Sequence, residues 1–368
     1  MSEAVEKFDG ILRFAIERQI SDVLLKSGQR PLYRRVGRLI SKREEATLDD
    51  AALSEIAARV LHADEAKAFN AGASITTTYG LIGAGRLRVH VSRQRGSIVL
   101  AVRVLPPRPP VLRDLRLPAP VAGLCNVETG LVLLVGGRGQ GRSTTAAAMI
   151  DAINTTATVA KQIATVEEPI EIVFDDKLAW ICQRAIGRDC ATAASGIRDA
   201  LIGDSDVVVV HEIGDAETLG AALDAAEAGK LVIAGVTALD IGQALRRLYA
   251  MVPPDALPMA RSRIAATFVG AMSQRLVPAA DGQRRLPACE VLVATSQVYG
   301  MIREGHDPVA FYDIMAASTQ LGMQTIDQSL YDMIQARAVA SEAAMAFAMR
   351  PAEIVAIRKG TRAESGLF

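Results

Sequence analysis

The residues with the clearest chemical potential lie in the segment GGRGQGRST, from Gly136 to Thr144. Their spacing is that of a phosphate-binding P-loop, G-x-x-x-x-G-K-[ST], which here runs from Gly136 through Gly141 to Ser143. In such a loop, backbone N–H groups and the N-terminus of the following helix point at phosphates. We expect Ser143 to supply a hydroxyl for Mg²⁺ beside ATP. The predicted nucleotide-binding residues are Gly136, Gly139, Gly141, Arg142, Ser143 and Thr144.

Arg142 stands where the P-loop motif requires lysine. The compact ammonium of lysine fits between β- and γ-phosphate oxygens, whereas the guanidinium of arginine keeps the charge on a larger, planar fork. The loop therefore predicts descent from nucleotide-binding proteins. It leaves open whether nucleotide is still bound.

Two acidic residues follow apolar runs that are typical of buried strands. Glu212 comes just after Val207–Val210 and could hold the Mg²⁺ shell or orient water, as in a Walker B motif. Glu167 ends the run that begins at Ile163 and could act as a general base. The plainer alternatives are a helix cap for Glu212 and a solvated acidic turn for Glu167. Because ligands of open α/β sheets lie at the carboxyl ends of the strands, both acids are candidates for the site formed by the loop.

The elements that would position these groups alternate between strand and helix. This alternation predicts an α/β fold, a mainly parallel sheet with helices on both faces. The expected strands are 131–135, 163–167, 206–210 and 231–236, and the expected helices are 142–155, 191–202 and 216–228. From about residue 242 onward we expect mostly helices, interrupted by a hairpin over 274–292.

The first hundred residues predict a small α+β domain. We expect helices over 4–19 and 48–69 and strands over 21–25, 33–40, 87–91 and 98–105. The arginines of interest in this domain are Arg86, Arg88, Arg95 and Arg103. They either form a solvated sheet face or act as arginine fingers that reach the nucleotide of a neighbouring subunit. A proline-rich stretch makes a semi-rigid linker. The predicted domains are therefore 1–104, a linker over 105–120, and 121–368.

Composition narrows the class of protein. The 41 basic and 41 acidic residues cancel, so net charge gives no reason to expect nucleic acid as a partner. No apolar run approaches the roughly 20 residues that span a bilayer, and the polar start lacks a signal-peptide pattern. The four cysteines have no metal-ligand spacing and suit a reducing compartment. We expect a cytoplasmic protein.

Several segments together resemble the PilT/PilU group of type IV pilus retraction ATPases, over about residues 10–350. The P-loop region is similar to that family's Walker A motif, and the stretch after Asp204 to its Walker B motif. The other segments that carry the resemblance are GRLRVHVSRQRG (85–96), VEEPIEI (166–172), QRAIGRD (183–189), AEAGKLV (226–232) and LGMQTIDQSLYDM (321–333).

The resemblance implies a PAS-like N-terminal domain and a RecA-like C-terminal domain, assembled as a hexameric ring. It implies ATP hydrolysis that drives pilus retraction, as in twitching motility, through a platform protein at the inner membrane, where the chain would be peripheral. Glu167 takes the place of the catalytic glutamate, Glu212 that of the Walker B glutamate, and Ser143 that of the Mg²⁺ ligand. The family's nucleotide-facing arginines lie near Arg88, Arg95 and Arg103.

Departures from the family pattern fall on polar positions of the site. Besides Arg142, Thr237 stands where the family has a histidine, and Gly214 where it has an arginine. We therefore predict weakened catalysis, in an accessory subunit beside an active PilT-type paralogue. Two alternatives stay open: a fully active motor in which Arg142 replaces the lysine, and a structural or regulatory paralogue that no longer binds nucleotide.

Overall fold

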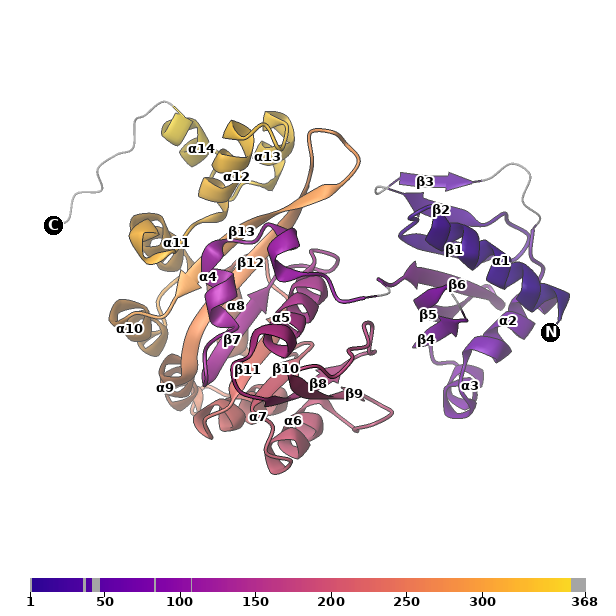
Figure 1. Cartoon of the computed structure of the whole chain (residues 1–368), viewed down its shortest axis with the longest axis horizontal. Coiled ribbons are helices and arrows are strands. Elements are labelled where there is room, and N and C mark those ends of the chain that lie inside the picture. Colours follow the sequence, from indigo (N-terminus) through magenta and orange to yellow (C-terminus); the bar gives the residue numbers. More distant parts are fainter. Residues whose placement is uncertain (1, 36–37, 42–46, 83, 107, 359–368) are drawn as a thin grey trace. The chain divides into compact units, whose positions relative to one another are not determined.

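The computed structural model describes residues 2–35, 38–41, 47–82, 84–106 and 108–358. The chain divides into two units (Figure 1). The N-terminal unit contains Met1–Arg108 together with Pro169–Val173, and the C-terminal unit contains Pro109–Glu168 and Phe174–Phe368. Within the described residues, no helix is both long and apolar enough to cross a membrane.

The N-terminal unit is built on a six-stranded antiparallel sheet in the order β3-β2-β1-β6-β5-β4. Its core holds fully buried side chains such as Phe8, Leu25 and Leu100. Its elements are α1 Glu3–Glu17, β1 Asp22–Lys26, β2 Leu32–Arg35, β3 Arg38–Ser41, α2 Asp50–Val60, α3 Ala63–Asn70, β4 Ile75–Leu81, β5 Gly85–Gln94 and β6 Ser97–Val104. The predicted α+β class of this unit is confirmed.

Three details of this unit differ from the sequence prediction. The strand predicted over 33–40 is two strands, because Tyr33 lies opposite Ile40 in the antiparallel register of β2 and β3; positions 36 and 37 of that prediction lie outside the described residues. The helix predicted over 48–69 ends at Val60 and a second helix begins at Ala63. Strand β4 was not predicted, since its sequence ITTTYGL is largely polar.

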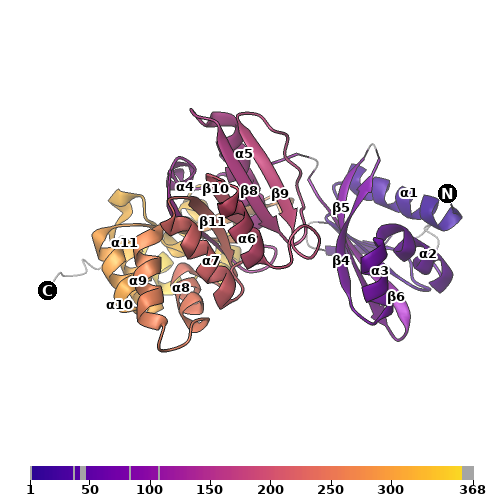
Figure 2. The ribbon, with the colours of Figure 1, turned by 90° about the horizontal axis from the view of Figure 1, so that it is seen from below.

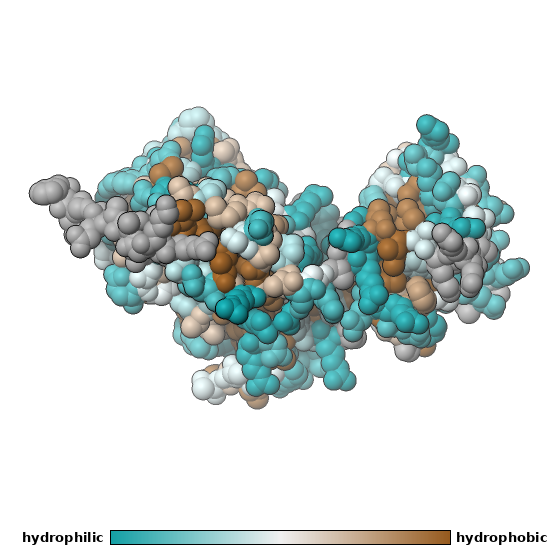
Figure 3. Space-filling model, turned by 90° about the horizontal axis from the view of Figure 1, so that it is seen from above, coloured by the Kyte–Doolittle hydropathy of each residue, from teal (hydrophilic) through white to brown (hydrophobic). Residues whose placement is uncertain are grey.

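Apolar side chains are exposed in each unit, and Figure 3 shows some of them as brown patches. In the N-terminal unit, Leu32, Leu39 and Ile40 on β2 and β3 are each more than a third exposed. In the C-terminal unit, the edge strand β9 exposes Trp180. Single exposed apolar residues are ordinary on protein surfaces.

The C-terminal unit contains a seven-stranded sheet in the order β13-β12-β7-β11-β10-β8-β9. Neighbouring strands are parallel except for the hairpin of β12 and β13. Its strands are β7 Gly130–Val135, β8 Lys161–Glu167, β9 Ala179–Ala185, β10 Val207–Val210, β11 Leu231–Val236, β12 Phe268–Pro278 and β13 Arg285–Val293. The predicted parallel sheet and the 274–292 hairpin are confirmed, whereas β9 was not predicted.

Helices cover both faces of this sheet (Figure 2). Strand β7 is buried along its whole length. Its Leu131, Leu133 and Val135 belong to one core cluster with residues of α6–α11, whereas α5 packs on the other face. The helices are α4 Ala119–Leu124, α5 Arg142–Thr156, α6 Ala193–Ile202, α7 Ala216–Glu227, α8 Ile241–Ala250, α9 Leu257–Thr267, α10 Ser296–Glu304, α11 Pro308–Ala317, α12 Ile326–Gln335, α13 Ser341–Phe347 and α14 Pro351–Arg358, with short 3₁₀ turns at η1 Leu112–Leu115 and η2 Thr319–Leu321.

Glu290 on β13 is a buried carboxyl with a measurable consequence for stability. Burial raises the pKa of Glu290 to about 8. The backbone N–H of Ile241, at the start of α8, donates to its carboxylate at 2.9 Å and partly offsets this rise. The folded protein therefore binds more protons than the unfolded chain between the usual carboxyl pKa and about pH 8. By linkage, this group's contribution to stability is present at low pH and is lost as pH rises through that window.

We expect Glu290→Gln to flatten this loss. The amide oxygen still accepts from Ile241, but the side chain no longer has to ionise in an apolar site. Between about pH 5 and pH 8 the variant should gain on the order of 3 kcal/mol relative to the wild type. Urea unfolding at both pH values measures this gain, with Glu55→Gln on the exposed face of α2 as control. An unchanged pH slope for Glu290→Gln would contradict the assignment.

Candidate functional site

The P-loop connects the buried strand β7 to α5, as its sequence predicts. Gly139 and Gly141 adopt positive φ angles of 73° and 91°, which favour glycine. Gly141 is the N-cap of α5, so the first turn of this helix has no side-chain cap. Its N–H groups are thus available to an anion. Ser143, in that turn, is exposed.

Arg142 turns inward from the first position of α5 and contacts two neighbouring strand ends. Its Nη1 donates to Glu212 Oε2 at 2.5 Å, after β10, and its Nη2 donates to Thr237 Oγ1 at 2.9 Å, after β11. The backbone N–H of Thr237 donates in turn to Glu212 Oε1 at 2.8 Å. The side chains of Arg142 and Glu212 are 13% and 24% exposed, so water screens this ion pair only partly. Arg142, Glu212 and Thr237 therefore form one hydrogen-bonded cluster, in which two residues that depart from the family pattern contact the predicted Walker B glutamate.

Gly235 in β11 makes room for this cluster, a role that the sequence analysis missed. A Cβ atom at this position would lie 2.0 Å from the backbone oxygen of His211 and 3.4 Å from Arg142 Nη1. A glycine inside an apolar strand is the sequence signal that could have indicated such a close approach.

The P-loop is also anchored to β12 by glutamine side chains. Gln140 Oε1 accepts from the N–H of Leu276 at 2.7 Å, and Gln274 Nε2 donates to the carbonyl of Gln140 at 2.5 Å. Gln274 Oε1 accepts from Thr145 at 2.8 Å, inside α5. These bonds hold the second half of the loop and the first turn of α5 against β12, a role of Gln274 that no sequence motif indicated.

Glu167 lies at the carboxyl end of β8, one strand from Glu212. Its Oε1 accepts from Thr165 Oγ1 at 2.6 Å and from Gln183 Nε2 at 3.0 Å. In the parallel register, Val166 pairs with Val210, so Glu167 and Glu212 follow directly paired positions of neighbouring strands. The structure thus brings the loop, Glu167, Glu212 and Thr237 to the same edge of the sheet.

The residues at this edge do not suit the Mg²⁺ ion that the resemblance implies. Both oxygens of Glu212 accept hydrogen bonds, and the guanidinium of Arg142 already balances its charge. Ser143 is exposed, so its hydroxyl remains accessible for a metal role.

The other predicted site arginines belong to the N-terminal unit. Arg88 on β5 lies directly opposite Arg103 on β6, and Arg103 lies opposite Asp22 on β1. Arg88 forms an ion pair with Glu171, and Arg103 Nε pairs with Asp22 at 3.0 Å. Arg95 is exposed in the turn between β5 and β6, with φ 51°. These side chains form part of an arginine-bearing sheet face.

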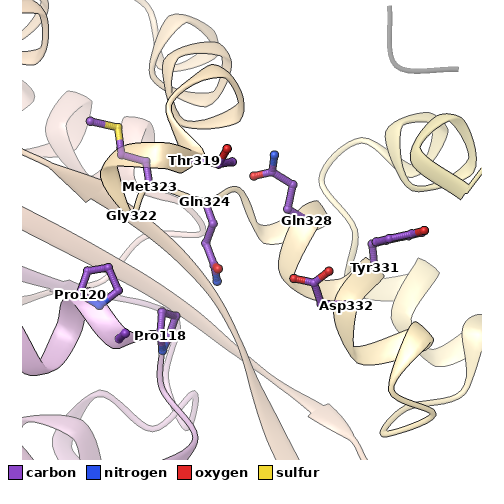
Figure 4. A pocket seen from close by; sticks show the side chains of 10 residues that line it. Pro118, Pro120, Thr319, Gly322, Met323, Gln324, Gln328, Tyr331 and Asp332 are labelled. Atoms are coloured by element: carbon purple, nitrogen blue, oxygen red, sulfur yellow. The ribbon is translucent and has the colours of Figure 1, made fainter. Parts of the chain in front are cut away.

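A separate pocket of about 600 Å³ opens in the C-terminal unit between the start of α4 and α12 (Figure 4). None of the P-loop residues lines it. Gln328, Tyr331 and Asp332 line it from α12, opposite Pro118 and Pro120, and the Tyr331 ring points away from the two prolines (Figure 4). Burial raises the pKa of Asp332, the pocket's carboxyl. Within the described residues, no hydrogen bond joins Asp332 to the hydroxyl of Thr319 or Tyr331, and the lining indicates no chemistry.

Comparisons with known proteins show which family the chain resembles. Residues 119–301 match the family described as Type II/IV secretion system protein. The chain is 33% identical over 320 residues to YggR of Escherichia coli K12, itself described as uncharacterized, covering 87% of this chain and 95% of YggR. It is 29% identical over 342 residues to the type IV pilus ATPase PilU of Pseudomonas aeruginosa, covering 93% of this chain and 88% of PilU.

A solved structure extends the likeness to both units. The crystal structure of the pilus retraction motor PilT with bound ADP has a TM-score of 0.82 and 32% sequence identity, and the match covers 94% of this chain and 98% of PilT. The similarity therefore spans the N-terminal unit as well as the P-loop unit. This chain belongs to the PilT/PilU group of type IV pilus retraction ATPases, within the type II/IV secretion protein family.

Proposed function

We propose that this chain is a nucleotide-binding subunit of a type IV pilus retraction machine in which ATP hydrolysis is weakened. It forms a homo-oligomeric ring of six subunits on the cytoplasmic side of the inner membrane, acts on the pilus platform protein, and works beside an active PilT-type paralogue. It has no nucleic-acid partner. Its two domains, 1–104 and 121–368, are connected by the linker over 105–120.

One observation carries the weakened catalysis. Arg142, at the position of the phosphate-binding lysine, is engaged with Glu212 and Thr237 instead of lying free in the loop. Phosphoryl transfer depends on a cation placed between the transferred and leaving phosphate oxygens, and a guanidinium held at Glu212 and Thr237 does not take that place even where it contacts a phosphate, which slows the reaction. The loop backbone and Ser143 remain suited to a phosphate group, Glu167 remains in place as the catalytic carboxylate, and the arginine-bearing face of the N-terminal unit supports a role toward a neighbouring subunit's nucleotide.

Thermal unfolding with ATP tests the binding part of this proposal. A nucleotide that binds only the folded protein raises its apparent stability by mass action, by about 2.7 kcal/mol at a concentration of 100 Kd. We expect a rise in Tm with millimolar ATP that sodium chloride at equal ionic strength does not produce. If millimolar ATP leaves the Tm unchanged both with and without Mg²⁺, the chain is the structural or regulatory paralogue that no longer binds nucleotide.

A further inference from the structure

Glu212 is saturated by donors from its own protein. One carboxylate oxygen accepts from Arg142 Nη1 and the other from the backbone N–H of Thr237. A carboxylate that serves a metal ion, directly or through water, presents its lone pairs and an uncompensated negative charge to the cation. Here the guanidinium of Arg142 supplies the compensating charge, at 2.5 Å.

The position of this guanidinium is determined from several sides. Thr237 contributes its hydroxyl to Arg142 and its N–H to Glu212, which ties both partners to the end of β11. Gly235 lets β11 pass close to the backbone at His211, just before Glu212, since a Cβ there would lie 2.0 Å from the His211 oxygen and in contact with Arg142 Nη1 at 3.4 Å. Low exposure of the Arg142 side chain, 13%, limits competition from water. The ion pair between Arg142 and Glu212 is therefore fixed by the surrounding structure and is not a surface contact.

We propose that the Arg142 guanidinium takes the place of Mg²⁺ in this P-loop, so that nucleotide binds as a metal-free polyanion. The inference rests on the proposed nucleotide binding. It replaces the expectation that Ser143 and Glu212 hold Mg²⁺.

The charges and donors around Arg142 explain why the metal is not needed. Guanidinium carries five N–H donors, and the bonds to Glu212 and Thr237 use two of them. The rest remain for phosphate oxygens, together with the first-turn N–H groups of α5 behind Gly141. A dication placed at Glu212 would sit against the guanidinium and be repelled by it. Mg²⁺ should therefore add nothing to binding, and it also masks charge on the free nucleotide.

Calorimetric titration with the non-hydrolysable analogue AMP-PNP tests this directly. The wild-type protein is titrated once with excess EDTA and once with excess Mg²⁺, at equal ionic strength. We expect the Kd in EDTA to equal the Kd in Mg²⁺ or to be smaller. In Arg142→Lys, the shorter single-point cation cannot hold Glu212 and Thr237 together, so Mg²⁺ should tighten binding by about tenfold or more.

Arg138→Lys is the matched control, because Arg138 is an exposed arginine of the same loop. It should keep the wild-type ratio of the two Kd values. Wild-type binding that appears only with Mg²⁺ would overturn the inference and leave the proposed function standing. Absence of binding in both conditions would remove the nucleotide-binding part of the proposed function and the inference with it. The wild-type arm decides the question even if Arg142→Lys does not fold.

Discussion

Arg142→Lys should increase ATP turnover, by at least about tenfold and up to on the order of 10²–10³-fold, the range associated with one charge-stabilising group at a transition state. Lysine restores a compact cation that reaches between phosphate oxygens. It also releases Glu212, because a single ammonium does not reproduce the two hydrogen bonds that arginine makes to Glu212 and Thr237. The gain is measured as the steady-state rate of phosphate release with ATP in excess.

Two further variants give this experiment its controls. Glu167→Gln in the Arg142→Lys background should abolish the gain, since the carboxylate at the end of β8 is the proposed catalytic group. Arg138→Lys should leave the wild-type rate unchanged. If the wild-type protein already turns over ATP as fast as a lysine-bearing PilT, the chain is a fully active motor and the weakened-catalysis proposal fails. An unchanged rate in Arg142→Lys would place the limiting defect elsewhere, for example at Thr237.

Gly235→Ala should destabilise the C-terminal unit by about 3 kcal/mol or more, at the upper end of the range for overpacking. Its Cβ would lie 2.0 Å from the backbone oxygen of His211, and the backbone there has little freedom to retreat, because the N–H of His211 donates to the carbonyl of Val166 at 2.9 Å. The N–H of Ile213 likewise donates to the carbonyl of Gly235 at 2.8 Å. The urea midpoint of unfolding, followed by circular dichroism, measures this loss.

Gly220→Ala provides a matched comparison for that substitution. Gly220 lies inside α7, and nothing lies within 4 Å of the Cβ that alanine would add. Alanine is the better helix former, so this variant should be more stable than the wild type by about 0.5–1 kcal/mol. A wild-type midpoint for Gly235→Ala would contradict the close packing of β11 against the residues after β10.

The elements around the site could be predicted well because their signals are local. Strands β7, β10 and β11 are continuous apolar runs buried along their length, and α5 and α7 follow them with helix-forming, alanine-rich sequence. Such runs mark central strands of a parallel sheet, whose carboxyl ends meet at one edge.

Strands β9 and β4 escaped prediction for the opposite reason. Strand β9 lies at the edge of the sheet, and only its first residue is fully buried. Its apolar run, Ala179–Cys182, is too short for periodicity to distinguish a strand from a helix. Strand β4 contains three consecutive threonines and is the last strand of its sheet. An edge strand is defined by hydrogen bonds to one neighbouring strand, β5 for β4 and β8 for β9, and its own side chains carry little record of them.

The P-loop shows most clearly what the sequence determines and what only the tertiary structure decides. The sequence by itself determined that a P-loop follows a buried strand, that acids end the neighbouring strands, and that arginine replaces lysine at position 142. Only the tertiary structure decided where that arginine points. Its partners Glu212 and Thr237 lie 70 and 95 residues further along the chain, and the sheet register brings them together. A long side chain has many rotamers of similar energy, and contacts across three strand ends select one of them.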